Sequence, residues 1–295
     1  MLCKNPFVRD PSGRVFKRYA LSGNIDVALD GVPFPCGQCL PCRINKRRLW
    51  THRLILESYA HDASCFVTLT YAPDYLPKDS SIHKEHVQLF IKRLRKSLQP
   101  KKIRYYFCGE YGPHTLRPHY HGIIFGLSLD YSNLIARCWP LGFSLTGDCN
   151  FNTIQYVAGY VTKKFVKKND SKNKEFSIMS RRPGLGFESL RKFVDLLGDK
   201  RFSNLFTSPR GIPSYLVING RKMPFDRFCK NKIELLLDFE HDTSAYIREL
   251  AIKYFQSLHT FSDSGQPLVD SLLAESRGRN LQIEARHKIF SRSTL

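Results

Sequence analysis

Three short runs of β-branched and aromatic residues, set among segments with helical spacing, constrain the fold of this chain most strongly. The runs are Cys65–Tyr71, Ile103–Cys108 and Tyr120–Phe125, and their composition is typical of β-strands. The second and third runs are close enough in sequence to pair as a hairpin, and hairpin pairing is antiparallel. The sequence therefore predicts an α+β fold in which helices cover an antiparallel sheet.

Apolar residues recur at helical spacing between and after these runs. The predicted helices cover residues 44–61, 86–98, 129–138, 153–168, 232–239 and 245–258. Residues 169–184 are polar and basic and include Pro183-Gly184, which predicts a linker or mobile loop. We expect three parts: a cysteine-rich N-terminal segment (1–43), a core domain (44–170) and a mainly helical C-terminal extension (171–295).

An excess of positive charge limits the partners of the chain. Lys and Arg number 46 against 26 Asp and Glu, which gives a formal net charge of +20. Such a surplus repels itself within a compact fold, and nucleic acid is the usual polyanion that balances it. An anionic membrane surface is an alternative partner, but no apolar run reaches the roughly 18 residues that a membrane span needs. The charge favours a nucleic-acid partner and no membrane.

Two features of the sequence indicate the same compartment. The N-terminus lacks the apolar region of a secretory signal. The nine cysteines are an odd number in a long chain, which disfavours a secreted disulfide framework. We therefore expect the protein in a reducing cytoplasm.

A histidine pair, His119 and His121, marks the third predicted strand. Side chains alternate along a strand, so both imidazoles lie on one face, close enough to bind one metal ion. Glu110 follows the preceding strand, and hairpin pairing brings its carboxylate to the same face. Two imidazoles and a carboxylate leave open coordination positions, as a metal that polarises a phosphate requires. A packed histidine pair without metal is the alternative, and His114 is interpreted as a surface loop residue.

A tyrosine pair, Tyr156 and Tyr160, lies in the helix predicted over residues 153–168. A spacing of four residues places both phenols on one helix face. Lys163 and Lys164 follow on that side, and an ammonium group favours the phenolate and the charge that builds on phosphorus. A phenol needs this help, because its unperturbed pKa is about 10. The pattern predicts a tyrosine nucleophile, with a packed amphipathic face as the alternative.

The order of these motifs resembles that of the HUH endonucleases. The chain is similar, over about residues 1–170, to the rolling-circle replication initiators of gokushovirus-type microviruses, which are single-stranded-DNA bacteriophages. The resemblance rests on Phe66–Tyr71, Pro118–His121, Tyr156-x3-Tyr160-x2-Lys163, the cysteine-rich Cys36-x2-Cys39-x2-Cys42-Arg43 and Cys108–Gly112.

The resemblance implies a ferredoxin-like or RRM-like sheet that binds Mg²⁺ or Mn²⁺ through the histidine pair. It also implies that Tyr156 or Tyr160 nicks the origin strand, which leaves a 5′-phosphotyrosine and a free 3′-hydroxyl, and that ends are rejoined at termination. Tyr160 with Lys163 matches the motif of one-tyrosine relatives, so we expect Tyr160 to cut. Gly159 stands where some relatives have a basic residue.

The expected partners are single-stranded DNA at the origin, a host polymerase and a host helicase. A separate helicase is expected because the sequence has no G-x4-G-K-[ST] segment for nucleotide hydrolysis. The basic residues expected to contact DNA are Arg43, Arg47, Arg48, Arg117 and Lys167.

The cysteines near the N-terminus suggest a second metal site. Cys36, Cys39 and Cys42 have the two-residue spacing of a zinc knuckle, and Cys3 is the candidate fourth thiolate. The Pro- and Gly-rich connection suits a small lobe that a structural zinc ion clamps. Reduced cysteines without metal are one alternative, and an iron–sulfur cluster, which more usually has its fourth cysteine nearby, is another.

Two further functions compete with a metal-dependent nickase and ligase. One is a non-catalytic protein that binds single-stranded nucleic acid, with a zinc-stabilised lobe and an RRM-like sheet whose aromatic rings stack on bases. Those rings are Tyr105, Tyr106, Phe107 and Tyr120. The other is a zinc-dependent regulator in which the cysteine-rich lobe is the primary site.

Overall fold

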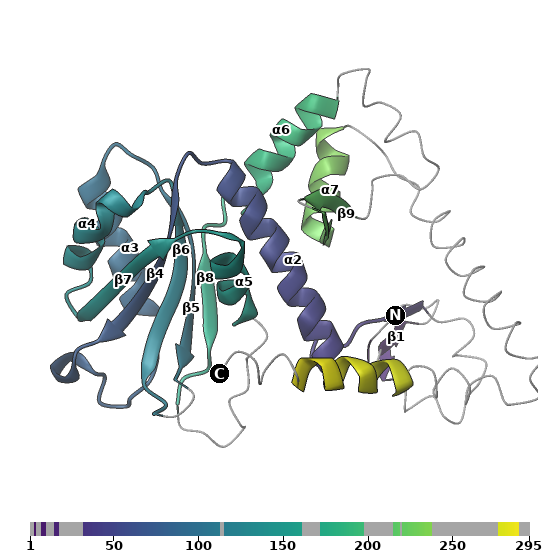
Figure 1. Cartoon of the computed structure of the whole chain (residues 1–295), viewed down its shortest axis with the longest axis horizontal. Coiled ribbons are helices and arrows are strands. Elements are labelled where there is room, and N and C mark those ends of the chain that lie inside the picture. The colour runs from purple at the N-terminus through teal and green to yellow at the C-terminus, as the bar shows by residue number, and fades with distance from the viewer. Residues whose placement is uncertain are drawn as a thin grey trace, which may run out of the picture. The chain divides into compact units, whose positions relative to one another are not determined.

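The computed structural model describes residues 3, 7–9, 15–17, 32–112, 115–160, 172–197, 215–218, 220–237 and 277–288 (Figure 1). The chain forms two compact units. The smaller unit contains Met1–Lys46 and Glu240–Leu295, and the larger unit contains Arg47–Phe239. The boundaries at 43/44 and 170/171 that the sequence suggests stay predictions.

A five-stranded antiparallel sheet organises the larger unit. In spatial order its strands are β7 (Gly142–Asp148), β4 (Ser64–Tyr71), β6 (Pro118–Phe125), β5 (Arg104–Tyr111) and β8 (Phe176–Met179). The predicted α+β class with an antiparallel sheet is confirmed. The central strand, β6, carries the histidine pair.

Helices cover both faces of this sheet (Figure 1). The helices that pack on one face are α3 (Lys84–Leu98) and α4 (Ser132–Cys138). Those on the other face are α5 (Phe151–Gly159) and the part of α2 (Leu40–Tyr59) that belongs to the larger unit. The strands alternate between the two layers because their apolar side chains do: Val67, Leu69 and Tyr71 face α3, whereas Ile123 and Phe125 face α2 and α5.

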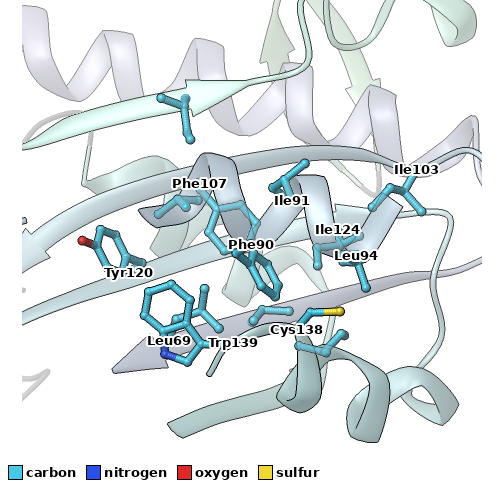
Figure 2. Packing of buried hydrophobic residues seen from close by; sticks show 14 of the residues in the cluster. Leu69, Phe90, Ile91, Leu94, Ile103, Phe107, Tyr120, Ile124, Cys138 and Trp139 are labelled. Carbon is cyan, nitrogen blue, oxygen red and sulfur yellow. The ribbon is translucent and has the colours of Figure 1, made fainter. Parts of the chain in front are cut away.

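The face under α3 is a closed hydrophobic core. Figure 2 shows Phe90, Ile91 and Leu94 of α3 among the buried side chains of the sheet. These residues recur at helical spacing, and each side chain is 2% exposed or less. Full burial of one such side chain contributes about 1.5–3 kcal/mol of transfer free energy. This layer therefore anchors the sheet, and chemistry is left to the opposite face.

A smaller group of elements completes the larger unit. It consists of α6 (Phe187–Leu197), the hairpin of β9 (Tyr215–Ile218) and β10 (Arg221–Pro224), and α7 (Arg227–Leu236). A buried carboxylate joins these elements to the sheet layer. Glu57 of α2 accepts hydrogen bonds from Arg104 Nε at 2.5 Å and from the Gly186 backbone N–H at 2.6 Å.

The smaller unit contains a three-stranded antiparallel sheet with the order β2-β1-β3. Its strands are β1 (Phe7–Arg9), β2 (Val15–Lys17) and β3 (Val32–Phe34). The first residues of α2 and a helix over residues 277–288 also belong to it. Each strand is only 3 residues long, so this sheet buries little surface.

Three sequence predictions need correction or fall outside these residues. Residues 169–184 were predicted to be a linker, but they contain β8, because Phe176 and Ile178 turn inward to the core beside β5. The helix predicted over 232–239 is α7, which begins earlier, at Arg227. The helix predicted over 245–258 lies outside the described residues. Among the residues that the structure describes, no helix is both long and apolar enough to span a membrane.

Candidate active site

Glu110, His119 and His121 meet on the face of the sheet opposite α3. Cross-strand pairing places Glu110 of β5 directly beside His119 of β6, and His121 follows two residues later on the same face. Glu110 Oε1 lies 2.7 Å from His119 Nε2 and 3.3 Å from His121 Nε2. The three possible ligand atoms lie within 4.8 Å of one another. The predicted hairpin thus assembles two imidazoles and a carboxylate, which we call the triad.

Neighbouring groups hold both imidazoles with Nε2 facing the carboxylate. The Nδ1–H of His119 donates to the Arg117 carbonyl at 3.0 Å, because a carbonyl can only accept. Thr68 Oγ1 of β4 lies 2.9 Å from His121 Nδ1. Hydrogen bonds of this kind orient metal-ligating histidines in proteins. The donor set and its orientation therefore suit a divalent cation.

Two aromatic rings also fix His121. The Tyr160 ring stacks on the His121 imidazole, with 5.1 Å between centroids and 7° between planes. The Phe66 ring stacks on it as well, at 5.9 Å and 13°. The imidazole plane is therefore set by packing, whereas Nε2 stays directed at the triad.

The two tyrosines reach the triad from α5. An asparagine cap starts this helix: the Asn150 side chain accepts hydrogen bonds from the backbone N–H groups of Asn152 and Thr153. One turn apart on the helix, the Tyr156 and Tyr160 rings contact each other with centroids 4.8 Å apart. The Tyr156 hydroxyl lies 3.4 Å from His121 Nε2. The structure thus brings both predicted tyrosines to the predicted metal ligands.

Exposure separates the two tyrosines. Tyr156 is 45% exposed, whereas Tyr160 is 5% exposed. Burial raises the pKa of Tyr156, the hydrogen bond with Tyr160 lowers it in part, and the Glu110 carboxylate raises it further. Burial also raises the pKa of Tyr160, and its hydrogen bond with Tyr156 and the charge of Glu110 act in the same direction. Both phenols are therefore neutral near pH 7 and need nearby positive charge to attack a phosphate.

The predicted cationic residues are spread around this site. Lys163, Lys164 and Lys167 lie outside the described residues. Arg47 of α2 donates from Nε to the Gln155 carbonyl of α5 at 3.2 Å. A Cβ at Gly159 would meet the Arg47 guanidinium at 3.5 Å. This glycine therefore lets an arginine from another helix approach the α5 backbone beside the tyrosines.

The remaining predicted DNA contacts differ in exposure. Arg48 of α2 is exposed. Arg117 donates from its guanidinium to the Tyr71 carbonyl at 2.6 Å, which ties the start of β6 to the end of β4. Arg43 is half-buried and belongs to the smaller unit.

The aromatic rings expected to form a stacking platform in the non-catalytic alternative do not do so. Tyr106, Phe107 and Tyr120 are each 0% exposed, and Tyr105 is half-buried. Phe107 and Tyr120 belong to the core under α3, whereas Tyr106 packs under α2 and α5. A base cannot reach these rings, so that expectation is corrected.

The four predicted cysteines gather in the smaller unit. The sulfur atoms of Cys3, Cys36, Cys39 and Cys42 lie within 4.8 Å of one another. Backbone N–H groups donate to these sulfurs: Cys36 N to Cys3 Sγ at 3.3 Å, and Cys39 N to Cys36 Sγ at 3.4 Å. Burial acts to raise the pKa of Cys36, but these and neighbouring hydrogen bonds lower it to about 6. Burial raises the pKa of Cys42.

Comparison with known proteins places this geometry in a family. The family model of the replication-associated protein ORF2 matches residues 64–165, a segment that contains the triad and both tyrosines. The replication-associated protein VP4 of Bdellovibrio phage phiMH2K is 29% identical over 260 residues, 78% of each chain. The replication-associated protein ORF2 of Spiroplasma virus 4 is 33% identical over 175 residues, 52% of this chain and 54% of that protein.

A third relative agrees with these two. The replication-associated protein ORF4 of Chlamydia phage 1 is 28% identical over 260 residues, 77% of this chain and 61% of that protein. No solved structure matches the chain. The chain belongs to the family of replication-associated proteins of ORF2 type that microvirus phages carry.

Proposed function

We propose that this protein is a metal-dependent endonuclease of the HUH type that nicks one DNA strand at a phage replication origin through a tyrosine. The observation that carries the proposal is the Tyr156 hydroxyl 3.4 Å from His121 Nε2, beside a triad of possible metal ligands. A nucleophile beside a site of this kind is suited to phosphoryl transfer. The net charge of +20 and the replication-associated family support DNA as the substrate.

Glu110, His119 and His121 would hold the cation, Mg²⁺ or Mn²⁺. Their donors form the two-histidine, one-carboxylate set that leaves coordination positions open. A cation bound there would supply positive charge that draws electron density from the scissile phosphate. Thr68 and the Arg117 carbonyl keep the two imidazoles in the orientation that this role needs.

The tyrosine performs the bond exchange. Its phenolic oxygen attacks phosphorus, the bond between phosphorus and the 3′ oxygen breaks, and a 5′-phosphotyrosine forms. The phenol gives up its proton, and the leaving 3′ oxygen takes one up as a hydroxyl. One phosphodiester replaces another, so attack by a 3′-hydroxyl reverses the step and rejoins ends. The free 3′-hydroxyl would prime a host polymerase during rolling-circle replication, while a host helicase unwinds the duplex.

The choice of first nucleophile rests on two criteria that point to different residues. The motif Tyr160-x2-Lys163 favours Tyr160, and that assignment stays a prediction. Exposure favours Tyr156, because a phosphate in solvent can reach its hydroxyl, whereas Tyr160 is 5% exposed and stacked on His121. Tyr160 would then act after the first cut has shifted the site.

A covalent-adduct assay tests the function and the order of the tyrosines. Single-stranded oligonucleotides that tile the phage genome are labelled at the 3′ end and incubated with the protein and Mn²⁺, with EDTA as the metal-free arm. Because the 5′ phosphate is captured, the 3′ label should migrate with the protein on a denaturing gel. If no segment gives a metal-dependent adduct, the proposal fails.

Variants of the same assay rank the tyrosines. From the exposures, Y156F should abolish the first adduct, whereas Y160F should retain a first cut and lose rejoining. The reverse result would support the assignment from the motif. Y59F is a matched control, because Tyr59 is also an exposed tyrosine, 60% exposed, at the end of α2.

We also infer that the four cysteines bind a structural zinc ion. Four thiol sulfurs form the complete ligand set of a tetrahedral zinc site. Backbone N–H groups donate to two of these sulfurs, which stabilises thiolates. The short strands of the smaller unit bury little surface, so a metal ion would contribute to its stability.

A further inference from the structure

The edge strand β7 has an inverted pattern of side chains. Its two large apolar residues, Phe143 and Leu145, are each 67% exposed, whereas Ser144 and Thr146 between and beyond them are half-buried. A strand at the edge of a sheet ordinarily turns its apolar residues to the core. Exposed apolar side chains that stand together mark a surface that binds something.

The register of the sheet places this apolar pair on the face of the triad. Phe143 is paired with Thr70, and Thr70 with His119. In the next row of the same face, Leu145 is paired with Thr68, and Thr68 with His121. Neighbouring strands lie about 4.8 Å apart, so each apolar residue is roughly 10 Å from its histidine. That distance is about three stacked nucleotides, at about 3.4 Å each.

The helix layer leaves this part of the face open. Ile154 and Val157 of α5 pack in one cluster with Tyr106, Ile123 and Phe125, which lie on β5 and β6. On this face the side chains of β4 and β7 are at least partly exposed. Tyr156 stands at the border, with its ring edge against Phe66 of β4 at 6.1 Å between centroids. The exposed apolar pair therefore begins where the exposed nucleophile is.

We propose that Phe143 and Leu145 form a stacking shelf for the bases next to the cleaved phosphate. This inference rests on the proposed nickase function and adds a substrate subsite to it. Unpaired bases offer a π-face to an aromatic ring, whereas paired bases in a duplex already stack on their neighbours. The shelf therefore favours single-stranded DNA, and it holds the strand so that the phosphate lies over the triad.

Binding without cleavage gives the first test. Fluorescence anisotropy of a labelled single-stranded oligonucleotide is measured in EDTA, with wild-type protein and with F143S and L145S. Loss of stacking on one residue weakens affinity roughly 5- to 150-fold, so F143S should lose at least about fivefold and L145S less. L89S is the matched control, since Leu89 is 45% exposed on α3, on the other side of the sheet.

A fluorescence signal tests the stacking itself. F143W keeps a ring on the shelf and should bind DNA like the wild type, with its emission quenched by the oligonucleotide. The same oligonucleotide with abasic positions beside the nick site should not quench it. The wild-type chain, with 2 Trp, provides the background, and Trp139 is buried.

The outcomes separate this inference from the proposed function. If wild type cleaves DNA but F143S and L145S bind and cleave unchanged, the shelf is wrong and the nickase stands. If no variant cleaves but F143W is quenched and F143S binds weakly, the shelf stands and the nickase is wrong. If F143S leaves affinity unchanged but converts an oligomer to a monomer in sedimentation, the surface is an interface between copies of this chain, and the shelf is again wrong.

Discussion

The two groups of metal-ligating side chains are held by the chain in opposite ways. The triad comes from two paired strands, β5 and β6, whose ladder aligns Glu110 with His119. The cysteines come from residue 3 and from the turn and helix start at 36–42. The triad has three nitrogen and oxygen donors beside an exposed tyrosine, whereas the cysteines have four thiols. Three ligands leave room for a substrate, and four complete the coordination of zinc.

The difference in support predicts a difference in what each metal does. Backbone hydrogen bonds and a buried core hold the triad, so it keeps its geometry without a cation. The cysteine cluster belongs to a unit whose three strands have 3 residues each, so its metal is expected to be part of the fold. Removal of the first metal should stop chemistry, and removal of the second should loosen structure.

The largest effect is expected from H119A. Loss of one imidazole removes a ligand without touching either tyrosine, because His119 packs on His121 and Glu110. Polarisation by the cation is worth several kcal/mol, so single-turnover cleavage should fall on the order of a thousandfold or more. Thermal unfolding should change little, since the His119 side chain is already partly exposed, at 18%.

The control for this variant is H83A, which removes a partly exposed imidazole that pairs with Asp79. Elemental analysis should show that H119A keeps the zinc of the cysteine cluster. Wild-type cleavage by H119A would remove the triad from the mechanism. Loss of zinc in H119A would instead break the distinction between the two groups.

The next effect is expected from C36S. Cys36 Sγ accepts hydrogen bonds from the backbone N–H groups of Gln38 and Cys39, and a serine oxygen is a weaker ligand for zinc. The wild type should hold about one zinc ion per chain, and C36S should lose it. Cobalt substitution gives a second readout, because only the wild type should show thiolate-to-cobalt charge transfer.

C149S is the matched control, since Cys149 is half-buried and outside the cluster. It should keep the metal content of the wild type. A wild-type protein that contains no zinc when prepared without chelators would mean that the cysteines are simply reduced thiols.

The sequence predicts the parts of the fold in which the side-chain pattern is dense. The strand over β4 and the helix over α3 emerge because their buried residues recur without interruption. The predicted second strand ends at Cys108, but β5 continues to Tyr111. Gly109 hides the pattern there: a Cβ at this position would lie 2.9 Å from the Phe176 ring, so glycine is needed for packing against β8.

Two strands have patterns that a single sequence does not reveal. β7 points its apolar residues outward, which reverses the expected alternation, and Gly142 and Gly147 make it resemble a loop. β8 has only 4 residues, too few for a period to stand out. Both strands are fixed by pairing with distant parts of the chain, and register across strands is a tertiary property.

The candidate site divides in the same way. The triad and the tyrosines are visible because histidine and glutamate on a predicted hairpin and tyrosines one helical turn apart are unusual patterns. Thr68 is not visible, since threonine is common in strands and its role depends on the pairing of Thr68 with His121. The Arg47 contact with α5 depends on a helix more than 100 residues away in sequence.

The smallest effect is expected from T68V, which sharpens the account of why the triad keeps its geometry. Valine has nearly the same shape as threonine but removes the hydroxyl that lies 2.9 Å from His121 Nδ1. Loss of such an orienting group weakens metal affinity roughly 10- to 100-fold, so half-maximal cleavage should need that much more Mn²⁺. At saturating Mn²⁺ the rate should recover, because the nucleophile and all three ligands are still present. T68S keeps the hydroxyl and should restore the wild-type metal dependence. An unchanged metal dependence in T68V would mean that the stacked rings of Phe66 and Tyr160 are sufficient to orient His121.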